Sequence, residues 1–384
     1  MTSDPNDAAP SGTAATAAVP ATGAKRVRPG IRAVLPRMLL AFALGTAGGT
    51  CFYLLSMPLP WMLGAMMATA IASFSGVRLA VDNRVRTTMM VVLGTLLGSA
   101  FSPEIAQRAT EWPISMASLV VYVVMASLMT FWFYHRFARI DSRTSFFSGV
   151  PGGLAEMITL GIAAGADDRK ISLAHTTRIF LVVMTLPLAF RIFGDFDAAA
   201  RAQAGHGVLD LAPLDVAMLT GAAIVGYALA KLLRIPAPQL TGPMFVSAAI
   251  HLTGLTAATP PVLVVSIAQV IIGSAVGSRF SGLKLREVAR YLMLGAIATV
   301  LLLSLTIVYA LVLQRLMDVP FGAFVLAFSP GGLTEMSLVA LAMHIDTAFV
   351  ATHHMVRIFI VVALTPHLFR FMDKVGMIDE PPKE

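Results

Sequence analysis

The chain consists of apolar runs separated by short polar segments. A helix needs about 20 predominantly apolar residues to cross the hydrocarbon core of a bilayer. Runs that reach or approach this length cover residues 36–56, 59–76, 87–102, 113–134, 171–193, 213–233, 237–254, 262–280, 291–313 and 348–370. The pattern predicts an all-α polytopic membrane protein.

Two further apolar segments, residues 144–166 and 321–345, are interrupted in the middle by Pro-Gly-Gly. Proline removes a helical hydrogen bond and glycine loosens the backbone, so a straight helix is not expected in either segment. Each segment is therefore either a kinked span or a re-entrant pair of half-helices that meet inside the membrane.

The composition supports a membrane environment. Of the 384 residues, 57% are hydrophobic and 13% are charged, whereas soluble domains carry about 25% charged residues. This excludes an ordinary soluble enzyme and makes the lipid bilayer the first expected partner. The net charge of +7 lies mostly in short loops. Because no long basic helix is available to read a groove, we expect no direct binding of nucleic acid.

The two interrupted segments are copies of one another at an offset of 179 residues. The first copy reads Pro-Gly-Gly-Leu-x-Glu-Met from Pro151, and the second reads the same from Pro330. The same offset relates Asp167, His175, Arg178, Phe180 and Pro187 to Asp346, His354, Arg357, Phe359 and Pro366, and Gly94, Gly98 and Phe101 to Gly273, Gly277 and Phe280. This agreement predicts a tandem duplication of one membrane unit.

Loop charges indicate how the two copies are oriented. The basic loop with Arg78, Arg84 and Arg86 corresponds to an uncharged loop over 255–261, and the next two loop pairs also differ in sign. Such alternation predicts inverted repeats, each with five spans and a re-entrant Pro-Gly-Gly element. If both interrupted segments spanned fully, the repeats would instead be parallel.

The predicted organisation has five parts. They are a disordered cytoplasmic tail over 1–33, a first membrane repeat over 34–194, a connector over 195–212, a second membrane repeat over 213–372 and a cytoplasmic tail over 373–384. The basic cluster before the first span places the N-terminus in the cytoplasm by the positive-inside rule. It contains Lys25, Arg26, Arg28, Arg32 and Arg37.

The interrupted segments also predict a site. Irregular backbone at membrane depth persists only where protein buries it or where it lines a watery cavity. The candidate substrate-binding backbone is Pro151, Gly152 and Gly153 together with Pro330, Gly331 and Gly332. Glu156 and Glu335 follow in the first turn of the next half-helix, where each carboxylate can exchange a proton or hold a cation.

A second candidate set lies on the span that follows each interruption. His175 and Arg178, like His354 and Arg357, are three residues apart and share a helix face. We expect each arginine to pair with a glutamate of the same or the other half, and an anionic substrate to compete for it. Alternatively, each Glu, His and Arg set is a static polar clamp that holds the interrupted segment.

The paired Pro-Gly-Gly-Leu-x-Glu-Met and His-x-x-Arg-Ile-Phe motifs resemble those of the AbrB-type bacterial membrane protein family. The resemblance covers nearly all of residues 36–372. Members are often labelled ammonia monooxygenase or AbrB family transcriptional regulator. The sequence supports neither label literally, since the histidines do not cluster as a copper site requires and no DNA-reading element occurs. An influence on gene expression would then be indirect.

Three functions follow in order of preference. The first is a secondary transporter of the bacterial inner (plasma) membrane, with multiple spans, which moves a small anionic or zwitterionic metabolite with a proton or sodium as coupling ion. The second is a membrane-embedded sensor of the same ligand, and the third is a membrane enzyme. We expect no enzymatic activity, no cofactor and no metal, because no nucleophile, nucleotide or metal-ligand motif occurs. Oligomers are compatible with the sequence.

Overall fold

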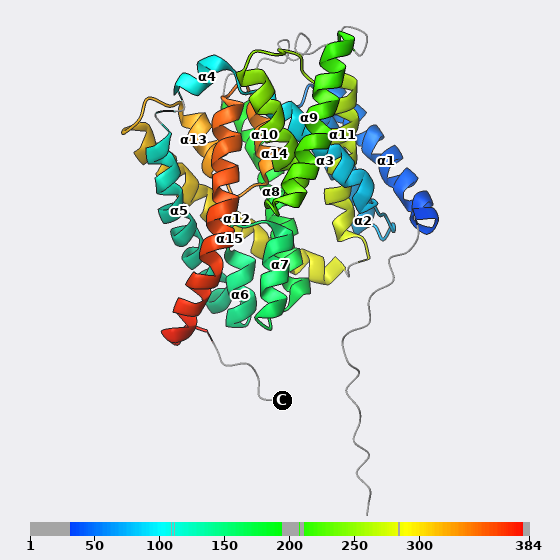
Figure 1. Ribbon diagram of the computed structural model, residues 1–384. Helices are drawn as coiled ribbons and strands as arrows, with labels where there is room; N and C mark the ends of the chain where they lie inside the picture. The colour runs from blue at the N-terminus through cyan, green and yellow to red at the C-terminus, as the bar shows by residue number, and fades with distance from the viewer. Residues whose placement is uncertain are drawn as a thin grey trace, which may run out of the picture.

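The structure is a computed structural model that describes residues 31–108, 110, 112–193, 207, 211–282 and 285–378. All regular structure in these residues is helical (Figure 1). Most of the predicted N-terminal tail and connector, and the end of the C-terminal tail, lie outside the described residues. The helices are α1 (Ile31–Leu54), α2 (Pro60–Phe74), α3 (Asn83–Gly98), α4 (Pro103–Arg108), α5 (Pro113–Trp132), η2 (Phe133–Phe137), α6 (Ser142–Gly149), α7 (Leu154–Ala163), α8 (Asp168–Phe193), α9 (Pro213–Leu232), α10 (Pro238–Leu252), α11 (Val262–Gly277), η4 (Ser278–Phe280), α12 (Leu285–Gln314), α13 (Phe321–Phe328), α14 (Leu333–Ala342) and α15 (Thr347–Lys374).

Seven helical segments are long and apolar enough to cross a membrane. They are Val34–Leu54, Pro113–Phe137, Asp168–Phe193, Pro213–Leu232, Val262–Phe280, Ala289–Gln314 and Thr347–Lys374. Three of the predicted spans form shorter helices, namely α2 and α10 with 15 residues each and α3 with 16. Both α2 and α10 start with proline after a residue in the left-handed region, Leu59 (φ 46°) and Ala237 (φ 50°).

The helices of the second half follow the order of the first. The starts of α2 and α10 differ by 178 residues, and those of α7 and α14, or of α8 and α15, differ by 179. The two halves exchange contacts, since α2 packs on α11 while α3 packs on α10. Likewise α8 packs on α12 and α5 on α15. One hydrophobic core therefore contains residues of both halves.

Glycines permit the close approach of helices that belong to different halves. A Cβ atom at Gly98 of α3 would lie 2.5 Å from the Met244 carbonyl oxygen of α10. At the equivalent position of the other half, a Cβ atom at Gly277 would lie 2.5 Å from the Met66 carbonyl oxygen of α2. Real side chains do not tolerate such distances, so both crossings need glycine. These glycines therefore serve close helix packing, as the spacing of small residues in the sequence predicts.

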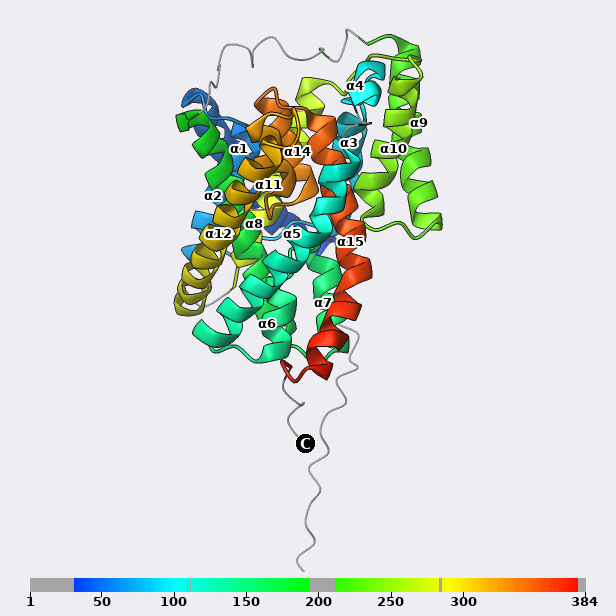
Figure 2. The same cartoon turned by 90° about the vertical axis from the view of Figure 1, so that its left-hand side faces the viewer.

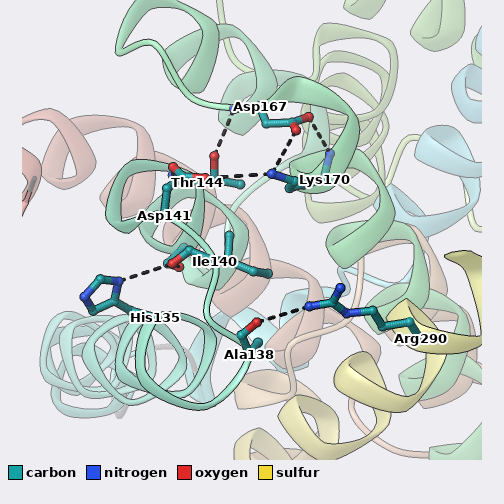
Figure 3. Close-up of polar contacts among 9 residues, drawn as sticks. His135, Ala138, Ile140, Asp141, Thr144, Asp167, Lys170 and Arg290 are labelled. Atoms are coloured by element: carbon teal, nitrogen blue, oxygen red, sulfur yellow. Dashed lines mark hydrogen bonds and ion pairs between the residues drawn. The ribbon is translucent and has the colours of Figure 1, made fainter. Parts of the chain in front are cut away.

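The first interrupted segment folds back on itself as a helical hairpin, because its two ends meet. Arg143 at the start of α6 donates from Nη1 to the carbonyl of Ala164, just after α7, at 2.8 Å. The backbone N–H of Asp167 donates to the Thr144 hydroxyl at 2.9 Å (Figure 3). In the second segment, a Cβ atom at Gly322 near the start of α13 would lie 3.1 Å from Ile345, just after α14. We call α6–α7 the first hairpin and α13–α14 the second hairpin.

The two hairpins enter the bundle from opposite ends (Figure 1). The first hairpin lies at the lower end, whereas α14 lies in the upper half in both views (Figure 2). The loop after α2 lies at the lower end with the loop after η4, since the backbone N–H of Leu79 donates to Ser281 Oγ at 2.9 Å. We call this lower end the basic end, because its loops and the adjoining helix ends carry Arg78, Arg136, Arg139, Arg143, Arg234 and Arg279.

Candidate functional site

Each hairpin has its helix break at the tip. In the first hairpin, α6 ends at Gly149 and α7 begins at Leu154, with Gly153 as the N-cap. In the second, α13 ends at Phe328 and α14 begins at Leu333 after the N-cap Gly332. Glycine has no side-chain acceptor, and neither N-cap makes a side-chain hydrogen bond. The first amides of α7 and α14 thus receive no hydrogen bond from an N-cap side chain.

His175 and Arg178 of α8 hold the first break. His175 Nε2 lies 2.8 Å from the carbonyl oxygen of Phe147, near the end of α6. Arg178 donates from Nη1 to the carbonyl of Val150 at 3.2 Å, and its Nη2 lies 3.1 Å from His175 Nδ1. If Nε2 carries the ring proton, Nδ1 accepts from the arginine, and both ring nitrogens of His175 are satisfied.

The second break is held in the same way by α15. His354 Nε2 lies 2.8 Å from the carbonyl oxygen of Leu326, and its Nδ1 lies 2.9 Å from Arg357 Nη2. Arg357 also donates to the carbonyls of Ser329 and Gly331, the latter at 2.6 Å. The last carbonyls of a helix have no intrahelical partner. These side chains supply one at membrane depth, where water is scarce.

The structure therefore corrects one expectation. Arg178 and Arg357 do not pair with the glutamates; within the described residues their hydrogen bonds go to carbonyls and histidines. Both arginines are only 4% exposed, and the Nε of each has no hydrogen-bond partner. The two charges come from different halves and are close enough to repel each other. The centre of the molecule thus carries positive charge without a bonded acid.

The glutamates lie beside the N-cap glycines. Glu156 and Glu335 are partly buried in the first turn of α7 and α14. A Cβ atom added to Gly153 or Gly332 would collide with the carboxylate of the following glutamate. Each carboxylate thus folds back over the break, next to the positive end of its helix dipole.

The two hairpins differ in exposure. Ala155 and Thr159 of α7 are exposed, whereas the equivalent Thr334 and Leu338 of α14 are 3% and 0% exposed. Contacts explain the difference, because α14 packs on α3 while α7 makes no comparable packing on α11 among the described residues. The first hairpin is therefore accessible along a face of α7 whose equivalent on α14 is buried.

Arg279 is a residue that the sequence analysis did not single out. It lies in η4, directly after α11, and is mostly buried. It precedes Phe280, whose ring packs on Phe180 of α8 at 5.6 Å and on Phe74 of α2 at 5.1 Å. A comparison of the two repeats could have identified it. The position 179 residues earlier is Ala100, whereas the flanking pattern Ser-x-Phe-Ser is the same in both halves. An arginine in one copy of a repeat indicates a role that the other copy lacks.

Other candidates have local explanations. His353, which neighbours His354, lies 2.8 Å from both Ser115 Oγ and the Phe349 carbonyl oxygen, so it is a satisfied core residue. No group of three or more metal-ligating side chains occurs among the described residues. A cavity of about 440 Å³ near α4, α10 and α15 is lined mainly by apolar side chains such as Trp112, Met116 and Met355.

All twelve candidate residues belong to the two hairpin tips and their clamps. In each half the clamp arginine reaches the break itself, since Arg178 Nη2 lies 3.5 Å from the Gly152 carbonyl oxygen and Arg357 Nη2 contacts that of Gly331. Pro151 and Pro330 are buried in the breaks. Their role in binding a substrate stays a prediction.

Comparisons with known proteins agree with this architecture. A family model described as "Transition state regulatory protein AbrB" matches residues 61–373. A Bacillus subtilis protein named "Uncharacterized protein YhjN" is 27% identical over 351 residues, which cover 86% of this chain and 91% of the relative. An Escherichia coli protein named "Putative regulator AbrB" is 26% identical over 324 residues, which cover 84% of this chain and 92% of the relative.

Proposed function

This chain belongs to the AbrB family, and from this premise we propose that it is a secondary transporter of a small anionic or zwitterionic metabolite. The observation that carries the proposal is the pair of helical hairpins, which enter from opposite ends and hold their helix breaks inside the bundle. Discontinuous helices that meet between inverted repeats are a common architecture of substrate sites in secondary transporters.

The charges at the breaks favour a ligand with an anionic group. Arg178 and Arg357 bring two buried positive charges, and the uncapped N-termini of α7 and α14 add partial positive charge. Isolated charges are costly at membrane depth. A bound carboxylate would therefore offset part of the unfavourable electrostatic free energy.

Glu156 and Glu335 are the candidates for ion coupling. Each lies next to a break and is partly buried, so each can bind a proton or help to hold a sodium ion during a cycle. No ATP-binding motif occurs in the sequence, which makes the ion gradient the proposed source of free energy.

We place the protein in the inner membrane with the basic end in the cytoplasm. Loops rich in arginine and lysine favour the cytoplasmic side, and the first hairpin enters from that end. Because α7 is exposed while α14 is buried, we interpret the structure as open toward the cytoplasm. If α7 became buried and α14 became exposed, the site would open toward the opposite side of the membrane.

The test is ligand binding followed by transport. Purified protein in detergent is screened by thermal shift against small carboxylates, amino acids and ammonium, beside Glu156→Gln and Glu335→Gln. We expect a shift in the wild type that both variants lose, and uptake of the same compound by proteoliposomes. If nothing shifts the wild type and both variants are less stable without ligand, the glutamates hold the structure and the proposal is wrong.

A second candidate is a membrane-embedded sensor that binds the same ligand without moving it. The name of the Escherichia coli relative, "Putative regulator AbrB", favours this candidate. Proteoliposomes separate the two candidates. Binding without uptake at any imposed proton or sodium gradient would favour the sensor.

A further inference from the structure

We propose that the cavity near α4, α10 and α15 binds one acyl chain of a phospholipid from the leaflet opposite the basic end. The cavity has a volume of about 440 Å³, within the range of about 300–1,000 Å³ that is typical of ligand pockets. None of the twelve candidate residues of the hairpin site lines it, and none of its lining residues is charged. The inference therefore goes beyond the proposed function and does not depend on it.

The other half of the molecule shows how the equivalent position is filled. At the basic end, the ring of Phe280 packs on Phe74 of α2 at 5.1 Å and on Phe180 of α8 at 5.6 Å. Phe280 is 1% exposed and Phe180 is 8% exposed. An apolar cluster thus closes the junction of these helices in one half.

The junction is open in the half that contains the cavity. Phe101 and Leu252, which correspond to Phe280 and Phe74, both line the cavity. Phe359, which corresponds to Phe180, is 40% exposed. The residue types still favour apolar contacts, but these side chains leave space between them. That space is suited to an apolar group from outside the chain.

A difference in side-chain size keeps the junction open. Gly295 of α12 lies so close to α8 that an added Cβ atom would collide with Thr177. The equivalent residue of α5 is Met116, which lines the cavity. Small residues allow helices to approach closely. The larger methionine keeps α5 from approaching α15 as closely as α12 approaches α8.

The mouth of the cavity faces the surroundings of the helix bundle. On α10, Phe245, Ala249 and Leu252 line the cavity and are exposed. Their spacing places them on one helix face, and they cover about 10 Å along the axis at the end of α10. The neighbouring helices α5 and α15 are long and apolar enough to cross a membrane (Figure 2). The medium at this mouth is therefore the hydrocarbon of the bilayer.

The lining favours a hydrocarbon over a polar ligand. Thr352 contributes the single hydroxyl group of the lining, and this group is buried without a hydrogen-bond partner among the described residues. A polar ligand would lose its hydration and gain few hydrogen bonds. An acyl chain is flexible and can restore the dispersion contacts that an empty cavity lacks. The bilayer supplies such chains at the mouth of the cavity.

The experiment uses Trp112 as a reporter, because it lines the cavity and is only 5% exposed. The full-length protein with Trp61→Phe and Trp132→Phe keeps Trp112 as its single tryptophan. It is reconstituted into phosphatidylcholine vesicles with brominated or ordinary acyl chains, since bromine quenches tryptophan at close approach. We expect Trp112 to lose most of its fluorescence in the brominated vesicles.

A variant that fills the mouth tests whether the chain enters the cavity. Ala249→Phe should restore most of the Trp112 fluorescence in brominated vesicles without lowering the melting temperature in detergent. Ala249→Leu, which adds less volume, guards against a folding defect and should lie between. The matched control is Ile71→Phe, because Ile71 is the exposed equivalent of Ala249 on α2. It should leave the quenching unchanged.

Native mass spectrometry gives an independent measurement. After mild removal of lipid, the wild type should retain one phospholipid that Ala249→Phe has lost. Equal quenching of Trp112 with and without Ala249→Phe would overturn the site, because the bromine would then act from the surrounding bilayer. An unquenched Trp112 in a dimer that Ala249→Phe dissociates would also overturn it, since a second copy would then cover the cavity.

Discussion

At the residue scale, the main feature is the pair of arginines that bind backbone carbonyls. Arg357 contacts the carbonyls of Ser329 and Gly331 and also His354. A planar guanidinium group reaches all three acceptors at once, whereas an ammonium group is a point donor on a flexible chain. The clamp therefore requires arginine for its geometry and not for its charge alone.

The first prediction follows from this geometry. Arg357→Lys should lower the free energy of unfolding by about 1–3 kcal/mol, because at least one buried carbonyl loses its partner. Arg178→Lys should behave similarly, with a smaller effect, since its contacts are longer. The melting temperature without ligand measures this change. Unchanged melting with lost ligand binding would instead show that the arginines contact the ligand.

At the element scale, the helices that pack across the two halves depend on glycine at their crossings. Gly98→Ala should destabilise the protein by about 1–3 kcal/mol, because the added methyl group overlaps the Met244 carbonyl and must push α3 from α10. The matched control is Gly221→Ala on α9, where nothing lies within 4 Å of an added Cβ atom. That variant should gain up to about 1 kcal/mol from helix propensity. Thermal unfolding measures whether Gly98→Ala lowers the stability of the protein and whether Gly221→Ala raises it.

The base of the first hairpin is closed by a small polar cluster (Figure 3). Lys170 Nζ lies 3.2 Å from Asp167 Oδ2, and the Lys170 N–H donates to Asp167 Oδ1 at 3.1 Å. Partial burial raises the pKa of Asp167, but the hydrogen bonds and charge of Lys170 outweigh it and hold the pKa below its ordinary value of 3.8. The folded state therefore prefers the charged carboxylate.

A pH-dependent prediction follows. A group with a lowered folded pKa stabilises the protein above its unfolded pKa and loses that effect as the pH falls through the folded pKa. Asp167→Asn should thus be less stable than the wild type at pH 7, by less than about 1 kcal/mol because the pair is partly exposed to solvent. The difference should vanish below the folded pKa. An equal difference at both pH values would show that the charge is not involved.

At the scale of the whole molecule, the two hairpins occupy different environments. Thr159 of α7 is exposed and its equivalent, Leu338 of α14, is fully buried. In a Cys51→Ser background, which removes the single native cysteine, Thr159→Cys should react much faster than Leu338→Cys with a charged, membrane-impermeant thiol reagent in inside-out vesicles. Equal reaction of both cysteines would contradict an opening on one side.

The orientation gives a further prediction for the whole chain. The five crossings predicted for each half would return α15 to the end from which α1 starts, which is the basic end (Figure 1). A fluorescent protein that folds only in the cytoplasm should therefore fluoresce when fused after residue 384, and a periplasmic phosphatase at that point should be inactive. The reverse pattern would invert the proposed orientation.

Features encoded over short stretches of the chain were predictable. Hydropathy predicted the helical membrane protein, and Pro-Gly-Gly predicted two breaks at the places where α6 and α13 end. The 179-residue offset anticipated the equal order of helices in both halves. Each of these features depends on neighbouring residues or on a simple comparison of the chain with itself.

Only the tertiary structure decided which groups meet. It showed that α6 and α7 form a hairpin closed by the contact of Arg143 with Ala164, and that Arg178 and Arg357 bind carbonyls rather than the glutamates. It also placed Phe280, which follows Arg279, against Phe180 of α8, 100 residues earlier in the chain. Local patterns determine where a helix starts and breaks, but the partner of a buried charge depends on how distant helices pack.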